Sequence, residues 1–435
     1  MLRRLEHYFE FARLKTTWRT EIIAGITTFV TMAYIVFVNP SILTEAGMPF
    51  QAVLAATCVC AAFGSILMGA FARYPIALAP GMGLNAYFTY TVVKGMHVPW
   101  ETALGAVFLS GVAFLILTLV GATKLISEAI PQELYSAVAA GIGLFIAMIG
   151  LRNAGIITAS ATTLVTVRNL RDKNTLLAIF GLLLTAALLT WGVKAAMLFG
   201  ILGTTLVGAF FGLVTWSPES NHLGDMAATA GRLDIGAAWK LGLLEVVFVF
   251  LFVDVFDNVG TLVGVSKKAG LFDSTQQIPR IKRILLADAS ATIVGSMAGT
   301  STMVSYIESA AGVAAGGRSG VTAIVTGLLF AVALFVAPVV GAVPSAATAP
   351  ALIVVGSLMM SHVGEIPWAQ PAVAIPAFLT ILTIPLTFSI ATGLSFGFTA
   401  YALLKLVRGE FRRSDWLVYL LAALFIARFV YLGAG

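Results

Sequence analysis

Long apolar stretches recur along this chain from about residue 20 almost to its end. A helix needs roughly 17 to 25 apolar residues to cross a hydrocarbon core about 30 Å thick, and most of these stretches reach that length. Charged residues make up only 11% of the 435 positions, whereas a soluble domain has about 25%. The sequence therefore predicts an all-α polytopic membrane protein.

About fourteen spans are expected, seven before a polar stretch at 217–240 and seven after it. The first set is expected near residues 20–38, 51–72, 76–95, 101–122, 132–151, 174–192 and 194–215. The second set is expected near residues 240–265, 280–298, 299–315, 320–338, 346–361, 371–388 and 390–407. An odd number in each half inverts the second half relative to the first, as in transporters built from inverted repeats.

Lys and Arg cluster in the connections, and short loops rich in these residues stay in the cytoplasm. The net charge of +6 therefore indicates topology and not a nucleic-acid surface. Residues 1–19 are expected as a basic cytoplasmic lead-in to a multi-pass protein of the cell's inner membrane, not as a signal peptide. The basic connection at 152–173 does not follow this rule, because alternation of the spans places it outside the cytoplasm. Residues 411–435 are expected either to span the membrane or to lie along its inner interface. The interfacial position is favoured, because a span would place Arg428 within the lipid.

Two segments in matching third positions are interrupted, at residues 74–88 and 299–312. Pro80 and Gly81 break the first helix, and the polar run 300–302 competes with helical bonding in the second. Broken backbone at membrane depth is tolerated only where it is buried in protein or lines a cavity. The pair therefore predicts a central binding site with half-helix N-termini aimed at a substrate. The alternative is an ordinary kink in a packing helix.

Several acidic residues lie inside apolar segments, where an ionised side chain has a high free-energy cost. Asp254 and Asp257 are three residues apart in one apolar segment, which places them on one helical face. A carboxylate at the centre of a span costs about 2.5 to 3.5 kcal/mol and should face the protein interior. Two ionised carboxylates this close repel each other, so protonation of one is favoured, as proton coupling requires. Glu308 and Asp288 are further acids of this kind, and each of the four could instead be a structural acid.

The segments that carry these acids contain no Lys or Arg, over residues 75–93, 254–265 and 285–317. Such a site suits a neutral, flat solute rich in N–H donors, to which a carboxylate offers two acceptors. Asn85 offers both a donor and an acceptor. Phe88, Phe252 and Phe256 could form an aromatic wall, although a Phe on a spanning helix more often packs.

No metal or cofactor is expected. Cys58 and Cys60 fall two positions apart inside an apolar segment and are expected as buried structural thiols. The four histidines fall in tails or loops, so no metal set or catalytic triad is available.

Four motifs carry a resemblance over nearly the whole length: Thr27–Phe29 with Asn39–Pro40, Ala79–Ala86, Asp254–Thr261 and Asp288–Gly317. The chain resembles the nucleobase-ascorbate transporters of the xanthine/uracil permease superfamily. Within them it is most similar to the AzgA-like purine permeases for adenine, guanine and hypoxanthine.

The resemblance implies the UraA-like fold of fourteen segments in two inverted repeats of seven, with segments 3 and 10 each a short strand plus a half-helix. It implies a substrate-binding core domain over 20–122 and 240–338, and a gate domain over 123–216 and 339–410. The C-terminal segment 411–435 departs from this plan.

The resemblance also implies purine import by proton symport, with the core moving like an elevator against the gate, and members of the family often dimerise through the gate. Glu308 would hydrogen-bond the purine edge and Asp254 would do so from the eighth segment, while Asn85 would orient the site. The implied substrate contacts are Glu308, Asp254, Asn85, Gly83, Phe88 and Ser305. The implied coupling or supporting acids are Asp257, Asp288 and Glu308.

Three alternatives stay open at this point. A transporter of the same fold could take uracil, xanthine or an inorganic anion. A passive channel could also contain interrupted half-helices, although clustered acids favour coupled transport. A membrane enzyme is the alternative from another class and is disfavoured by the histidine positions.

Overall fold

The computed structural model describes residues 2–121, 131–214, 223–240, 244–269, 271, 278–336, 340–410 and 416–431. Eight helices among these residues are long and apolar enough to cross a membrane, and four shorter apolar helices accompany them. The expected helical membrane protein is therefore confirmed, whereas the count of fourteen segments stays a prediction. The chain forms two compact units, Met1–Leu119 with Leu151–Ala351 (unit 1) and Val120–Gly150 with Leu352–Gly435 (unit 2).

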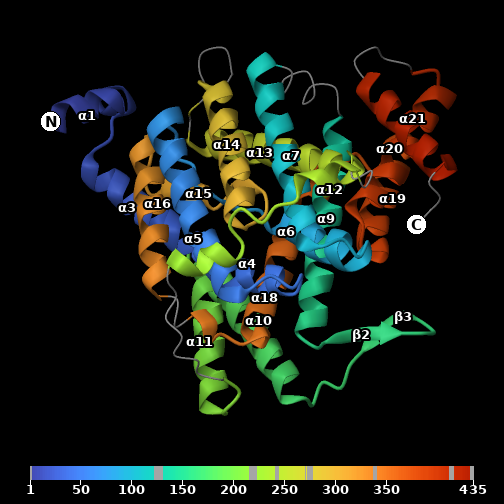
Figure 1. Cartoon of the computed structure of the whole chain (residues 1–435), viewed down its shortest axis with the longest axis horizontal. Coiled ribbons are helices and arrows are strands. Elements are labelled where there is room, and N and C mark those ends of the chain that lie inside the picture. The colour runs from blue at the N-terminus through green and yellow to red at the C-terminus, as the bar shows by residue number, and fades with distance from the viewer. Residues whose placement is uncertain are drawn as a thin grey trace. The chain divides into compact units, whose positions relative to one another are not determined.

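The first part of unit 1 is helical apart from one short strand (Figure 1). Its elements are α1 (Leu2–Tyr8), α2 (Phe11–Leu14), α3 (Trp18–Met32), α4 (Ile35–Thr44), α5 (Phe50–Leu67), the π-helical η1 (Met68–Ala72), β1 (Leu78–Pro80), α6 (Met82–Ala86), the π-helical η2 (Tyr87–Gly95) and α7 (Trp100–Val120). Helix α3 begins after Thr17, whose side chain accepts a hydrogen bond from the Thr20 backbone N–H.

The second part of unit 1 begins with a hairpin and ends in helix α18, which continues into unit 2. Its elements are β2 (Ile157–Ser160), β3 (Leu164–Val167), α10 (Lys173–Thr190), α11 (Ala196–Phe210), η3 (Leu223–Ala228), α12 (Ile235–Lys240), α13 (Leu244–Ala269), α14 (Ile281–Ala298), β4 (Met303–Ser305), α15 (Ser309–Ala314), α16 (Gly320–Ala333), η4 (Leu334–Val336) and α18 (Ser345–Met359). Unit 2 contains most of α9 (Gln132–Asn153), followed by η5 (Met360–Glu365), α19 (Pro371–Thr387), α20 (Ile390–Val407) and α21 (Trp416–Tyr431).

The expected spans and these helices agree within a few residues along most of the chain. The two interrupted segments each contain a strand of three residues followed by a short helix. Strands β1 and β4 pair antiparallel, with Leu78 opposite Ser305 and Pro80 opposite Met303. Every residue of both strands is buried, so this non-helical backbone lies inside protein, as membrane depth requires.

Helix α16 packs closely against α3, α5 and η1. The contact with η1 is a contact of backbones, because a Cβ placed on Gly320 would lie 2.0 Å from the carbonyl oxygen of Gly69. A Cβ on Gly69 would in turn lie 2.3 Å from the Gly320 carbonyl oxygen. Inside a membrane no hydrophobic effect drives helices together, and small residues stabilise their association by letting the backbones approach closely.

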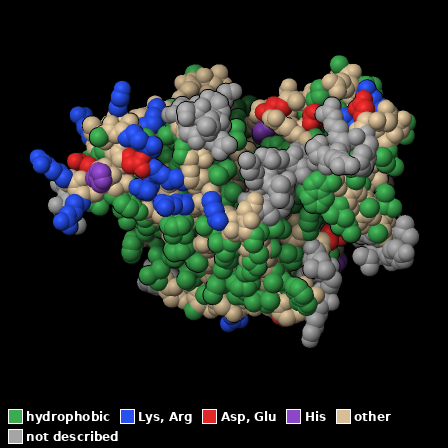
Figure 2. Space-filling view, turned by 90° about the horizontal axis from the view of Figure 1, so that it is seen from above, with side chains coloured by type: hydrophobic (Ala, Val, Ile, Leu, Met, Phe, Trp, Pro, Cys, Tyr) green, Lys and Arg blue, Asp and Glu red, His purple; other side chains and the backbone are tan. Residues whose placement is uncertain are grey.

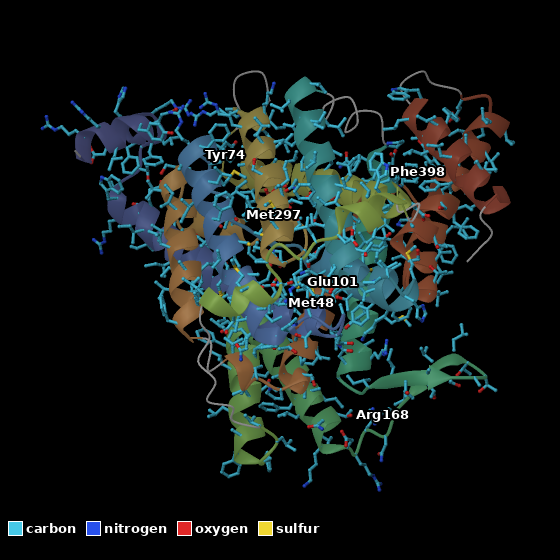
Figure 3. All side chains as sticks on the ribbon, viewed as in Figure 1. Met48, Tyr74, Glu101, Arg168, Met297 and Phe398 are labelled. Carbon is cyan, nitrogen blue, oxygen red and sulfur yellow. The ribbon has the colours of Figure 1, made fainter. Side chains whose placement is uncertain are left out.

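The basic connection at 152–173 forms the β2–β3 hairpin, which the sequence did not predict. Arg168, next to this hairpin, lies toward one end of unit 1, and Tyr74 lies toward the other end (Figure 3). The N-terminal helix α1 lies on the Tyr74 side (Figure 1). The hairpin and the N-terminal helices are therefore at opposite ends of unit 1, as alternation of the spans predicts. Cys58 and Cys60 are both buried and free.

In unit 2, helix α20 packs against α19 and α21, and Phe145 of α9 meets Phe388 edge-on at 5.5 Å. Residues 411–415 and 432–435 of the C-terminal segment lie outside the described residues. The expected gate range 123–216 is divided between the two units. The division into core and gate domains stays a prediction.

Candidate functional site

The β1–β4 pair joins the two interrupted segments. The Gly81 backbone N–H donates to the Thr302 carbonyl at 2.9 Å, and the Tyr306 N–H donates to the Ala77 carbonyl at 3.0 Å. The Tyr306 hydroxyl also donates to the Pro80 carbonyl at 2.5 Å. Helices α6 and α15 leave this pair at opposite ends, which are about 7 Å apart for strands of this length.

Asn258 of α13 connects two buried acids to strand β4. Its amide nitrogen lies 2.8 Å from Asp254 Oδ1 and 2.5 Å from Asp288 Oδ2. Its carbonyl oxygen accepts a hydrogen bond of 2.7 Å from the Ser305 backbone N–H. All three side chains are fully buried, so one amide holds two carboxyl groups and one strand in place.

Thr292 of α14 makes a second connection between the acids and the strand. Its hydroxyl donates to the Met303 carbonyl at 3.0 Å and accepts from the Met303 N–H at 3.1 Å. It also lies 3.5 Å from Asp254 Oδ2. Asp254 is therefore enclosed between two side chains that also hold the ends of β4.

Glu308 lies between β4 and α15, one residue before that helix begins. The Tyr34 hydroxyl, from the break between α3 and α4, donates to Glu308 Oε1 at 2.8 Å. Tyr34 is buried, whereas Glu308 is only half-buried. The glutamate therefore has a fixed orientation and remains partly exposed.

Asp257 is the second half-buried acid. Helix α13 packs against α15 and β4, and the Asp257 and Glu308 carboxyl groups lie within electrostatic range of each other. Among the described residues, no Lys or Arg forms an ion pair with Asp254, Asp257, Asp288 or Glu308. The four acids thus form an enclosed pair, Asp254 and Asp288, and a partly exposed pair, Asp257 and Glu308, which we call the accessible pair.

Asn85 belongs to a separate polar cluster that is fully buried. Its amide donates to Asn39 Oδ1 at 2.5 Å. Asn39 in turn donates to the Thr57 and Thr300 hydroxyls, at 2.7 and 3.2 Å. This cluster joins α4, α5 and the two interrupted segments, so Asn85 holds the half-helix in position.

The other expected site residues differ in access. Gly83 is half-buried at the start of α6, whereas Phe88 is fully buried and Ser305 nearly so. Phe252 and Phe256 are buried, and their rings contact each other in a tilted arrangement with centroids 4.6 Å apart. Among the described residues no group of three metal-ligating side chains occurs.

Four residues of this region were not proposed as site residues from the sequence: Tyr34, Asn39, Asn258 and Thr292. Asn39 and Asn258 stood within the motifs and are polar side chains inside apolar segments, which was a usable signal. Tyr34 and Thr292 gave none, because Tyr and Thr are common in spanning helices and their partners are distant in sequence.

The fold and these motifs agree with comparisons to known proteins. The family model Xan_ur_permease, described as "Permease family", matches residues 19–432. The chain belongs to this permease family. The family membership that the motifs indicated is thereby confirmed, and the chain is a multi-pass membrane transporter and not an enzyme.

Two relatives match over almost their whole length. The chain is 44% identical over 430 residues to the adenine permease AdeP of Escherichia coli K12, covering 99% of this chain and 97% of the relative. It is 46% identical over 440 residues to the guanine/hypoxanthine permease PbuG of Bacillus subtilis, covering 98% of this chain and 100% of the relative.

The structure is also similar to the transmembrane domain of a cyanobacterial bicarbonate transporter, BicA. The TM-score is 0.67 at 15% identity, and the match covers 87% of this chain and 98% of that domain. At this identity the similarity shows a shared fold and nothing about the solute.

Proposed function

We propose that this permease imports purine bases of the adenine, guanine and hypoxanthine class by proton symport. The observation that carries the proposal is the accessible pair of acids, Glu308 and Asp257, beside the junction of two interrupted segments. The relatives named for adenine and for guanine/hypoxanthine support the substrate class.

In the proposed complex the purine lies against the accessible pair. A carboxylate oxygen accepts the ring N–H or exocyclic amine hydrogens of a neutral base, and two acids present several acceptors to one flat edge. Tyr34 keeps Glu308 oriented, so little side-chain freedom is lost on binding. Gly83, half-buried at the start of α6, leaves room for close approach from the other interrupted segment.

The motif resemblance assigned the α13 contact to Asp254, and the geometry favours Asp257 for it. Asp254 is fully buried between Asn258 and Thr292, whereas Asp257 is half-buried near Glu308. We therefore propose that Asp254 and Asp288 form the proton-carrying pair. Phe88 and Ser305 then support the backbone around the substrate and do not contact it.

Proton coupling follows from the enclosed pair. Two ionised carboxylates on one amide, with no cation beside them, would repel strongly in a medium of low dielectric. A proton shared by Asp254 and Asp288 removes that repulsion. Asn258 also holds the Ser305 backbone, so gain or loss of this proton acts on the strand next to Glu308.

The wider architecture is part of the same proposal. Fourteen segments in two inverted repeats, a core that moves like an elevator against a gate, and a cytoplasmic N-terminus fit the shared fold and the third-position breaks. Dimerisation through the gate and a location in the cell's inner membrane complete it.

An inorganic anion is the competing solute, since a bicarbonate transporter shares the fold. Four acids with no paired cation disfavour an anion, because its charge would be added to theirs. A passive channel is disfavoured by the enclosed carboxyl pair, which needs a proton to be stable.

Uptake of labelled adenine in cells without other purine permeases tests the proposal. Unlabelled adenine, guanine and hypoxanthine are expected to compete, while xanthine, uracil, bicarbonate and sulfate are not. An uncoupler that collapses the proton gradient is expected to stop accumulation above the external concentration. Competition by the anions alone would show that the transported solute is an anion and not a purine. Accumulation that persists with the uncoupler would show that an ion other than the proton drives uptake.

A further inference from the structure

The N-terminal helices turn their acids inward and their cations outward. Glu6 accepts a hydrogen bond of 2.9 Å from the Trp18 indole, and Glu10 forms ion pairs with neighbouring arginines. Four exposed cations remain without an ion pair to any described residue. They form what we call the N-terminal basic surface: Arg3, Arg4, Lys15 and Arg19.

This surface is held firmly on unit 1. The Glu10 carboxylate bonds to Arg280 at the start of α14, and it lies 3.5 Å from Arg73 after η1. The Arg73 guanidinium also donates to the Tyr8 carbonyl at 2.9 Å and lies over the Tyr8 ring at 4.9 Å. Several separate contacts thus fix α1 and α2 on unit 1.

Apolar packing adds to the attachment. Phe9 and Phe11 are buried in a cluster with Val321 of α16, and Phe11 contacts the Trp18 ring at 5.0 Å. Between the helices lies an open groove of about 790 Å³ whose lining includes Arg3 and Lys15 together with Glu6 and Glu10. Two of the four cations of the basic surface therefore line this groove.

Helix α3 carries an exposed apolar stripe that begins next to Arg19. Ile22, Ile23 and Ile26 are exposed and follow Arg19 at helix positions i+3, i+4 and i+7, so all four share one face. The stripe extends about 10 Å from Arg19 along the helix axis. Figure 2 shows Lys and Arg side chains gathered at the end of the molecule that carries the N-terminal helices, next to a broad apolar surface.

We propose that the N-terminal basic surface and the α3 stripe together bind an anionic phospholipid. The headgroup phosphate lies against the cations of the N-terminal basic surface, and an acyl chain lies along the three isoleucines. An apolar stripe that begins at a cation fits a molecule with a charged head and a long tail. A soluble acidic protein or a nucleic acid would leave the stripe unused, and a free phosphate would need only the cations.

Lipid bound to the intact chain tests this inference. The protein is purified in a neutral detergent, mixed with phosphatidylglycerol or phosphatidylcholine of the same acyl chains, and the bound lipids are counted by native mass spectrometry. The triple variant Arg4→Gln, Lys15→Gln, Arg19→Gln is expected to bind phosphatidylglycerol about fivefold more weakly for each cation removed. Phosphatidylcholine binding should be the same in both proteins.

A matched control removes the same residue types from the hairpin end of unit 1. Arg168→Gln, Arg171→Gln, Lys173→Gln also deletes two arginines and one lysine from exposed positions, and it should leave phosphatidylglycerol binding unchanged. A charge-preserving variant, Arg4→Lys, Lys15→Arg, Arg19→Lys, should retain phosphatidylglycerol binding. Retained binding would show that the Gln variant loses phosphatidylglycerol through its missing charges and not through misfolding.

Three results with the variants would overturn the proposal. The Gln variant could bind as much phosphatidylglycerol as the parent, the control could lose as much as the Gln variant, or the charge-preserving variant could lose as much as well. Excess inorganic phosphate should not displace the lipid. Complete displacement by phosphate would instead make the surface a site for free anions.

Discussion

Tyr34 and Glu308 are 274 positions apart in sequence and are joined by a hydrogen bond of 2.8 Å. The tyrosine lies at the break between α3 and α4, and the glutamate lies just after β4. The bond therefore joins the first apolar stretch of the chain to the second interrupted segment. It also gives the half-buried acid a neutral donor in place of a cation, which leaves the acid able to accept hydrogen bonds from a solute.

Removing this donor is expected to weaken purine binding. In Tyr34→Phe the ring remains and Glu308 loses its orientation, at a cost of about 0.5 to 1.5 kcal/mol, so the uptake KM should rise about threefold to tenfold. Tyr74→Phe is the control, because it removes the hydroxyl that lies 3.3 Å from Ser266 and leaves Glu308 unchanged. Equal KM values for Tyr34→Phe and the parent would show that the bond has no part in binding.

Neutralising Glu308 is expected to have a larger effect. Glu308→Gln replaces an acceptor oxygen by a donor NH₂ group, which cannot pair with a purine N–H. Purine uptake should be lost while the protein stays in the membrane at normal levels. Glu133→Gln makes the same change at the first turn of α9 and should transport normally. Normal accumulation by Glu308→Gln would remove this residue from the site.

Most of the fold was predictable because a bilayer demands long apolar helices, and these are visible in sequence. The two interrupted segments were also predictable, since Pro80, Gly81 and the Thr300–Thr302 run break helices locally. The pairing of β1 with β4 joins residues more than 200 positions apart, and nothing in either segment specifies its register. The β2–β3 hairpin was missed because its strands are exposed and lack a buried face.

Asp254 and Asp257 show, within the site, the same limit on what the local sequence can predict. Helical spacing correctly placed Asp254 and Asp257 on one helix, yet three residues correspond to about 300° of rotation, which leaves roughly 60° between the side chains. Packing of β4 against that helix, with Asn258 and Thr292 around Asp254, buries one acid fully and leaves the other partly exposed. Which acid is accessible depends on neighbours that the local sequence does not specify.

Substitutions of the two α13 acids, Asp254 and Asp257, should therefore have different effects on transport. Asp257→Asn is expected to raise the purine KM about tenfold or more, because it removes a charged acceptor beside the substrate. Asp254→Asn is expected to leave binding of labelled purine nearly intact, but to reduce concentrative uptake and flatten its pH dependence. Binding and uptake measured at several pH values check both variants. The reverse pattern would return the substrate contact to Asp254.

The backbone contact between η1 and α16 predicts a stability effect away from the site. Gly69→Ala places a methyl group 2.3 Å from the Gly320 carbonyl, and overpacking of this kind costs about 1 to 3 kcal/mol. The thermal midpoint of the purified protein should fall. Gly224→Ala is the control, because no atom lies within 4 Å of a Cβ at that position. An unchanged midpoint for Gly69→Ala would mean that α16 can shift without loss.

Asn258→Asp tests the enclosed acid pair through the sign of its pH dependence. The change replaces the amide donor between Asp254 and Asp288 by a third carboxyl group. When the new group is protonated it can still donate one hydrogen bond. When it is ionised it adds a like charge to a buried site, which costs about 3 kcal/mol or more.

The stability defect of Asn258→Asp should therefore shrink as the pH falls and grow as the pH rises. Thermal midpoints of the variant and the parent in detergent, compared across acidic and alkaline buffers, measure the difference. Asn169→Asp, at an exposed position whose side-chain oxygen accepts from the Arg171 N–H, is the control and should show no such trend. A defect of the same size at every pH would mean that Asn258 acts through its bond to the Ser305 backbone alone.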